Sequence, residues 1–325
     1  MPRLRKSRWL LVLLGGFCWN GRDDALANKE SVPLDLKRFN IVTAGWLQVA
    51  RPGIRMHNVA YQKWDEAVER IRQSRGQSKE LVHAFQCHGS AAGQEQTALL
   101  YSPVVDFYSY YAFLYTSKQG PGEGELIWPG LDQPFINHAR QMRRNAGDTP
   151  IYAHIFLPGH GEAFKDRRAS LEEIQWQVFA AIGAQHRGLV WQSVGNSERA
   201  RQYVEELEAR LKEYAVDLGC TRMIDWATEA SGQPISALRS DGKLFVVLLD
   251  ASYMQLAPEE QTVMFPMERR AQERKVILDA PKGVQVSNAR TLLGKALPIE
   301  RENGRHVVEV RFTGGGEMII FDLAE

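Results

Sequence analysis

The fold is decided by residues 149–195, TPIYAHIFLPGHGEAFKDRRASLEEIQWQVFAAIGAQHRGLVWQSVG. An apolar run over residues 151–157 predicts a buried strand, and a second run over residues 188–193 predicts the next one. Between them, Ser170 and Glu173 have the spacing of a capping box, which predicts the start of a helix. Strand, helix and strand in this order predict a βα unit in a parallel sheet.

The same alternation extends over residues 38–218. Further strands are expected at residues 39–46, 81–87 and 104–113, and further helices at residues 57–76, 134–145 and 197–218. No Gly-rich phosphate loop follows any of these strands, which argues against a dinucleotide-binding sheet. We therefore expect an α/β fold of the (β/α) TIM-barrel type. It would be incomplete or rebuilt, because only five or six strands are predicted and a full barrel has eight.

After Gly219 the pattern changes to short strands separated by turns. Asp241-Gly242 and Asn303-Gly304 are strong hairpin signals. Residues 308–312 alternate apolar and charged side chains, as a half-buried strand does. The sequence thus predicts a barrel-like domain over residues 28–220 and an antiparallel β-sandwich over residues 221–325.

The first 27 residues have the three parts of a secretory signal peptide. A basic segment precedes the eleven-residue apolar run 9–19, and Ala25-Leu26-Ala27 forms an A-x-A cleavage site. The apolar run is too short to span a bilayer as a helix. We expect cleavage after Ala27 and a secreted or periplasmic protein with no membrane span in the mature chain; an uncleaved anchor is the alternative.

Composition and charge exclude several classes of protein. The chain has 325 residues, of which 44% are hydrophobic and 24% are charged, as in ordinary globular proteins. Loss of residues 1–27 removes five basic and two acidic groups and changes the net charge from +1 to −2, which gives no reason to expect nucleic acid as a partner. Cys87 and Cys220 remain, either as a disulfide or as two buried thiols. No cofactor or metal site is expected, since no zinc spacing such as H-E-x-x-H is present.

The stretch quoted first, with its E-x-x-x-W-Q helix and G-L-V-W strand, resembles the last two βα units of β-galactosidase-type glycoside hydrolases with TIM barrels. VVDFYSYYAF (residues 104–113) resembles the preceding barrel strand, and the region from about residue 235 resembles the small sandwich often appended to such enzymes. The resemblance covers roughly residues 100–325. It implies a sugar-binding cleft at the carboxyl ends of the strands and two catalytic carboxylates.

The sequence departs from this family where the catalytic carboxylates belong. The strand that should supply the nucleophile has His154 and no acid, and no strand ends in Asn-Glu. Glu162, in the loop after that strand, and Asp106, within an aromatic run, are the candidate catalytic acids, and an acid on the long loop that holds Glu123 and Glu125 is the alternative. The alternative is that these residues have no catalytic role. Glu162 and His160 would then be solvated loop residues, and Asp106 would begin its strand and be bonded to backbone or a neighbouring arginine.

Candidate sugar-binding residues cluster at the predicted strand ends, where aromatic rings can stack on sugar C–H faces and polar groups can bind hydroxyls. Packing in the core is the competing interpretation for the aromatic ones. The candidates are Trp46, His88, Tyr110, Tyr111, His154, His160, Trp191 and Gln192.

Two hypotheses from different classes follow. The first is a secreted glycoside-hydrolase-like enzyme that acts on an oligosaccharide or polysaccharide. The second is a non-catalytic carbohydrate-binding protein on a degenerate barrel; a structural envelope protein without a ligand is a weaker third. Neither the sugar nor the oligomeric state is predicted.

Overall fold

A computed structural model describes the chain in nine stretches, residues 36–43, 54–57, 64–77, 82–87, 98–111, 133–156, 171–192, 198–250 and 271–324. The predicted signal peptide lies outside these stretches, and so do Trp46, His88, His160 and Glu162. No helix in the described stretches is long and apolar enough to cross a membrane.

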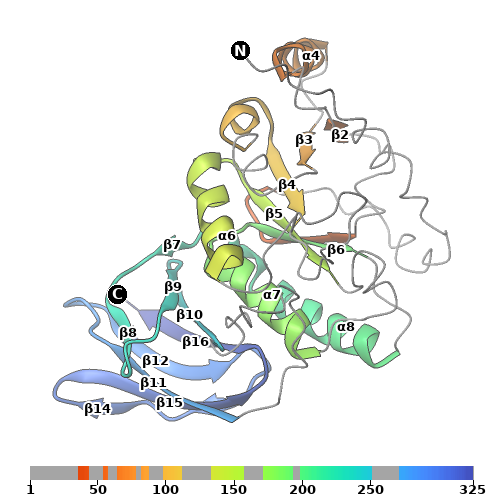
Figure 1. Ribbon diagram of the computed structural model, residues 1–325. Coiled ribbons are helices and arrows are strands. Elements are labelled where there is room, and N and C mark those ends of the chain that lie inside the picture. Colours follow the sequence, from red (N-terminus) through yellow and green to blue (C-terminus); the bar gives the residue numbers. More distant parts are fainter. Residues whose placement is uncertain are drawn as a thin grey trace, which may run out of the picture. The chain divides into compact units, whose positions relative to one another are not determined.

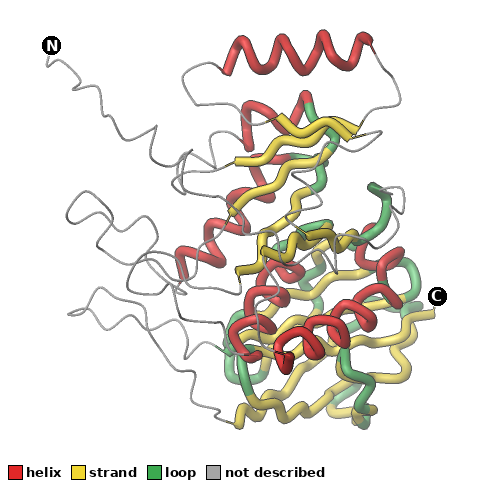
Figure 2. Tube along the Cα trace, turned by 90° about the vertical axis from the view of Figure 1, so that its right-hand side faces the viewer, coloured by secondary structure: helices red, strands yellow, loops and turns green. Residues whose placement is uncertain are grey.

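The first half of the described chain builds a six-stranded parallel sheet with helices between its strands (Figures 1 and 2). The spatial order is β1-β6-β5-β4-β3-β2. Its strands are β1 (Asn40–Thr43), β2 (Ile54–His57), β3 (Val82–Cys87), β4 (Phe107–Tyr111), β5 (Ile151–Phe156) and β6 (Gly188–Gln192).

This strand order is the cyclic order of a (β/α) barrel. From β2 to β6 each strand pairs in parallel with the next one in the chain, and β6 then pairs in parallel with β1. A doubly wound sheet would instead place its first strand in the interior and reverse direction there. Within the described residues β1 and β2 are not paired, so the sheet fits a partial barrel with its gap at that position.

The long helices of this half overlap the helices that the sequence predicts. They are α4 (Trp64–Gln77), the 3₁₀ turn η2 (Ser102–Val104), α6 (Gln133–Ala146), α7 (Leu171–Gly183), α8 (Glu198–Glu213) and α9 (Ala215–Gly219). Pro134 lies in the first turn of α6, where its missing N–H is no loss. In α7 the predicted apolar stripe, including Ile174 and Val178, is fully buried. The single long helix expected at its C-terminal end is instead α8 and α9, separated at Tyr214.

The second half consists of two antiparallel sheets. One has the order β13-β12-β16-β10-β9-β7, and the other β14-β15-β11-β8. The strands are β7 (Arg222–Met223), β8 (Ala227–Glu229), β9 (Ile235–Arg239), β10 (Lys243–Leu249), β11 (Ala271–Leu278), β12 (Gln285–Thr291), β13 (Ala296–Leu297), β14 (Glu300–Glu302), β15 (Arg305–Thr313) and β16 (Gly316–Ala324). Buried residues of both sheets, among them Val246 and Phe321 of the first and Val276 and Val308 of the second, form a single hydrophobic cluster.

Both predicted hairpin turns are present. Asp241-Gly242 connects β9 to β10, and the turn is closed by the Ser240 N–H, which donates to the Lys243 carbonyl over 2.9 Å. Asn303 and Gly304 connect β14 to β15 with φ angles of 50° and 82°. Two consecutive left-handed residues are what a tight I′ turn requires, which explains the Asn-Gly pair.

Helix α7 lies between the parallel sheet and the antiparallel part, in contact with β5 and also with β10 and β16. Gly315 shows how close this packing is, because a Cβ there would collide with the Glu172 backbone and with Trp176. The described part of both halves accordingly belongs to one compact unit, which extends from Pro33 to Glu325.

Three sequence expectations are wrong in detail. Strand β2, IRMH, was not predicted, because four residues that include an Arg give no apolar run. The helix that was expected to begin at His57, the last residue of this strand, begins at Trp64. The strand expected at residues 104–113 begins only at Phe107. Cys220 is not a buried thiol but a free, exposed one, whose S–H donates to the Val216 carbonyl.

Candidate functional site

The carboxyl ends of parallel strands lie at one edge of a sheet, and in barrels this edge carries the site. Here β4 ends at Tyr111, β5 at Phe156 and β6 at Gln192. The predicted binding residues Tyr110, Tyr111 and Gln192 are therefore at this edge, as the last residues of their strands. The segments that continue from these strands carry the predicted His160 and Glu162, outside the described residues.

A buried polar pair lies behind this edge. Ser109 of β4 and His154 of β5 are joined by a hydrogen bond of 2.6 Å between Oγ and Nε2, and neither side chain is more than 1% exposed. The strand register explains the contact, because Ser109 pairs with Tyr152 and the next-but-one residue, His154, projects to the same face. The bond fixes the imidazole ring just below the carboxyl edge.

An aromatic stack continues the same face toward the amino end of the strands. The rings of Phe107 and Tyr152 are stacked with centroids 4.5 Å apart. The Tyr152 ring also lies over Gly188 of β6, where a Cβ would be only 2.8 Å from a ring carbon. This face therefore changes along the strands from packed aromatic rings to a polar pair near the carboxyl edge.

Trp191 lies on the opposite face of the sheet from His154. It pairs with Ile155 and Thr43, and alternation along β5 places Ile155 on the other side from His154. The indole is 2% exposed, and its Nε1 has no hydrogen-bond partner within the described residues. The structure thus separates two residues that the sequence analysis assigned to one sugar site, and the position of Trp191 fits the competing interpretation of core packing.

Asp106 is at the wrong end of the sheet for catalysis at the carboxyl edge. It lies in the bend just before Phe107, where β4 begins, and its side chain is half-buried. In barrels the amino-end edge serves stability. This placement fits the alternative that Asp106 begins its strand, and its role as a catalytic acid stays a prediction.

The amino-end edge carries a polar cluster with a structural role. Arg187, just before β6, donates to the carbonyls of Leu218 and Thr221 over 2.7 and 2.8 Å. Arg143 donates to the Thr149 carbonyl over 3.1 Å. Burial lowers the pKa of both guanidinium groups, and Arg143 lowers that of Arg187 further. The bonds to backbone carbonyls compensate this burial and tie the strand starts to the helix ends.

None of the six described parallel strands contains an Asp or Glu. Within the described residues no cluster of His, Cys, Asp and Glu could hold a metal ion. The residue that sequence reasoning missed is Ser109. Its contact with His154 could be recognised only once the strand register was known, since the two residues are 45 positions apart in the sequence.

No family model and no curated protein matches the sequence. Similar solved structures include an α-amylase from H. orenii, with 10% identity and a TM-score of 0.41 over 82% of this chain and 58% of that one. An α-galactosidase from Saccharomyces cerevisiae has 10% identity and a TM-score of 0.41 over 78% and 74%. A glycoside hydrolase family 5 protein from Bacteroides vulgatus has 12% identity and a TM-score of 0.42 over 80% and 58%. This chain thus spans only a little over half of the α-amylase and of the family 5 protein, and the assignment of a barrel-like sheet depends on its own strand order.

Proposed function

We propose that this protein is glycoside-hydrolase-like and acts on an oligosaccharide or polysaccharide at the carboxyl edge of its parallel sheet. The observation that carries the proposal is the cyclic strand order, in which β6 returns to pair with β1. In barrels that edge carries the active site. The buried Ser109–His154 pair places polar groups close to this edge, and the strands that end there finish in residue types, Tyr and Gln, that suit sugar rings and hydroxyls.

Glu162 is our candidate for the catalytic acid. In the sequence it follows the end of β5 by six residues. Glycoside hydrolysis needs one carboxyl group to protonate the leaving oxygen and another to stabilise the oxocarbenium-like centre or activate water. Glu123 and Glu125 are candidates for the second group, since they follow β4 in the sequence and β4 is the neighbour of β5.

A second candidate function is carbohydrate binding without hydrolysis. The lack of a carboxylate in the six described strands favours it, because these are the positions from which barrel hydrolases of the type resembled here deliver their acids. We further propose that residues 1–27 direct secretion or periplasmic export with cleavage after Ala27, and that the two antiparallel sheets form a β-sandwich domain over residues 221–325. Sequencing the amino terminus of exported protein tests the cleavage site.

The test of function is release of reducing ends from a panel of plant, algal and bacterial polysaccharides by the exported protein. We expect release that Glu162→Gln abolishes. Glu205→Gln, a change at an exposed carboxylate of α8, is the matched control and should retain full activity. Asp106→Asn should also retain activity. Loss of activity in this variant would instead identify Asp106 as the catalytic acid.

The remaining outcomes separate the two functions. Retention on one polysaccharide without release of reducing ends would replace the first function by the second. Neither release nor retention on any member of the panel would overturn both.

A further inference from the structure

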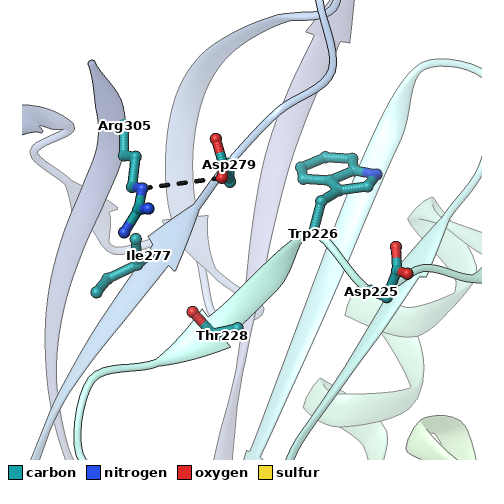
Figure 3. A pocket seen from close by; sticks show the side chains of 6 residues that line it. All are labelled: Asp225, Trp226, Thr228, Ile277, Asp279 and Arg305. Atoms are coloured by element: carbon teal, nitrogen blue, oxygen red, sulfur yellow. Dashed lines mark ion pairs between the residues drawn. The ribbon is translucent and has the colours of Figure 1, made fainter. Parts of the chain in front are cut away.

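A second candidate site lies on the antiparallel part, far along the sequence from the parallel strands. It is a hollow of about 360 Å³ beside β8 and β11 (Figure 3). Its size is within the usual range of small-molecule sites. The lining residues are Asp225, Trp226, Thr228, Ile277, Asp279 and Arg305.

Trp226 supplies the aromatic surface of the hollow. It precedes β8, and its carbonyl accepts the Asp279 N–H over 2.8 Å. One part of its side chain packs against the hydrophobic cluster between the two sheets, and the residue is only half-buried. Trp226 is therefore supported on one side by the cluster and keeps accessible surface, which stacking on a sugar ring requires.

The polar groups around the indole are available to a ligand. Arg305 and Asp279 face each other across 3.8 Å between Nε and Oδ2, which is too long for a hydrogen bond, and their side chains are 55% and 74% exposed. Asp225 and Thr228 are exposed as well. Figure 3 shows the Asp279 carboxylate on the side of the hollow between Arg305 and the indole. The hollow thus combines several donor and acceptor groups with an aromatic ring.

This chemistry fits a neutral polyhydroxylated ligand better than an anion. Two carboxylates beside one guanidinium would repel a phosphate or a sulfate. A neutral pyranose has an apolar C–H face for the indole, hydroxyl protons for the Asp carboxylates and hydroxyl oxygens for Arg305.

We propose that the hollow around Trp226 binds a neutral sugar unit of a saccharide chain, separately from the carboxyl edge of the parallel sheet. The choice of a saccharide as the ligand rests on the proposed function, in which the substrate is an oligosaccharide or polysaccharide. A second binding point of this kind would raise the affinity for a polymer by holding it at two places.

The test measures the affinity of the full chain for neutral polysaccharides by affinity electrophoresis, in a Glu162→Gln background so that the polymer stays intact. We expect Trp226→Ala and Arg305→Ala each to weaken retardation by about fivefold or more. Arg311→Ala is the matched control. Arg311 is on the same strand and forms a similarly exposed pair with Glu273, 3.7 Å apart, but does not line the hollow.

Each remaining outcome has a defined meaning. Because Trp226 also contacts the hydrophobic cluster, Trp226→Ala can unfold the sheets, and Arg305→Ala and Asp279→Asn at exposed positions then decide. Equal retardation of the Glu162→Gln protein with and without Arg305→Ala or Asp279→Asn overturns the proposal. If the wild-type protein hydrolyses the polymer but these changes do not affect retardation, the proposed function stands and this site is rejected. If these changes abolish retardation and the wild-type protein hydrolyses nothing, the site stands and the hydrolase function is rejected.

Discussion

Arg290 of β12 holds the carboxylate of Asp322 on β16 through two parallel hydrogen bonds, Nη1 to Oδ2 at 3.0 Å and Nη2 to Oδ1 at 3.1 Å. Lys243 of β10 donates a third bond of 2.6 Å to the same carboxylate. The Arg290 Nε also donates to the Tyr214 hydroxyl over 3.2 Å, between α8 and α9. One carboxylate thus links three neighbouring strands and, through Arg290, the helical part of the chain.

We expect Asp322→Asn to lower the free energy of unfolding by about 1–3 kcal/mol at pH 7, because an amide replaces charge-assisted bonds and leaves two cations facing each other. The hydrogen bonds from Arg290 and the bond from Lys243 outweigh the effect of burial, which raises the pKa, and together they lower the pKa of Asp322 to about 2. The carboxylate therefore stabilises the fold above about pH 4, and this contribution is lost as the pH falls toward 2. Urea denaturation of both proteins between pH 2 and 7 measures the difference.

The control for this experiment is Glu309→Gln. Glu309 is a 76% exposed carboxylate whose nearest cation, Lys275, is 4.0 Å away. Its loss should change the stability by less than about 0.5 kcal/mol. A stability difference for Asp322→Asn that is no larger than this, or that is the same at pH 2 and pH 7, contradicts the role assigned to the pair.

Glu317 gives the opposite pH dependence. It lies near the start of β16, and its Oε1 accepts the Met318 N–H over 2.9 Å. Burial raises the pKa of Glu317 to about 7, against a smaller lowering by the Met318 N–H and by Lys295. The folded state thus retains a proton that the unfolded state releases above about pH 4.5, so this group makes the protein less stable as the pH rises from about 4.5 to 7.

We expect Glu317→Gln to stabilise the protein by about 2–3 kcal/mol at pH 8 and to change little at pH 4, since Gln keeps the acceptor oxygen and cannot ionise. Chemical denaturation at the two pH values gives both numbers. Glu300→Gln, at an exposed position of β14, should show no such gain. Equal effects of Glu317→Gln at pH 4 and pH 8 would show that the carboxyl group is not titrating in the folded protein.

The parallel sheet and the hairpins could be predicted because each depends on local sequence. The runs IYAHIF and GLVWQ are apolar over the length of a strand, and Asn303-Gly304 supplies the left-handed turn that its hairpin needs. Strand β2 could not be predicted, because its four residues gain their strand geometry from pairing with β3 and carry no pattern of their own.

The candidate site was less predictable because it depends on register. The sequence indicates that His154 and Trp191 lie on neighbouring strands, but only the pairing of Ile155 with Trp191 shows that they project to opposite faces. The same holds for Asp106, whose distance from the carboxyl edge became clear only when β4 was found to begin at Phe107.

Gly188, the first residue of β6, tests the packing beneath the site. A Cβ there would be 2.8 Å from the Asn40 carbonyl oxygen of β1 and 2.8 Å from a ring carbon of Tyr152. Neither neighbour can move easily, because one is backbone and the other is a fully buried ring stacked on Phe107.

We therefore expect Gly188→Ala to lower the free energy of unfolding by about 1–3 kcal/mol. Gly76→Ala is the matched control, because Gly76 is an exposed residue of α4 where an added methyl group would have no neighbouring atom within 4 Å. That change should instead raise stability by up to about 1 kcal/mol, through helix propensity and the loss of freedom in the unfolded chain. Guanidinium denaturation of the two variants measures both shifts. A neutral Gly188→Ala would mean that β1, β5 and β6 are not packed in the register described, and the barrel order on which the proposed function depends would have to be abandoned.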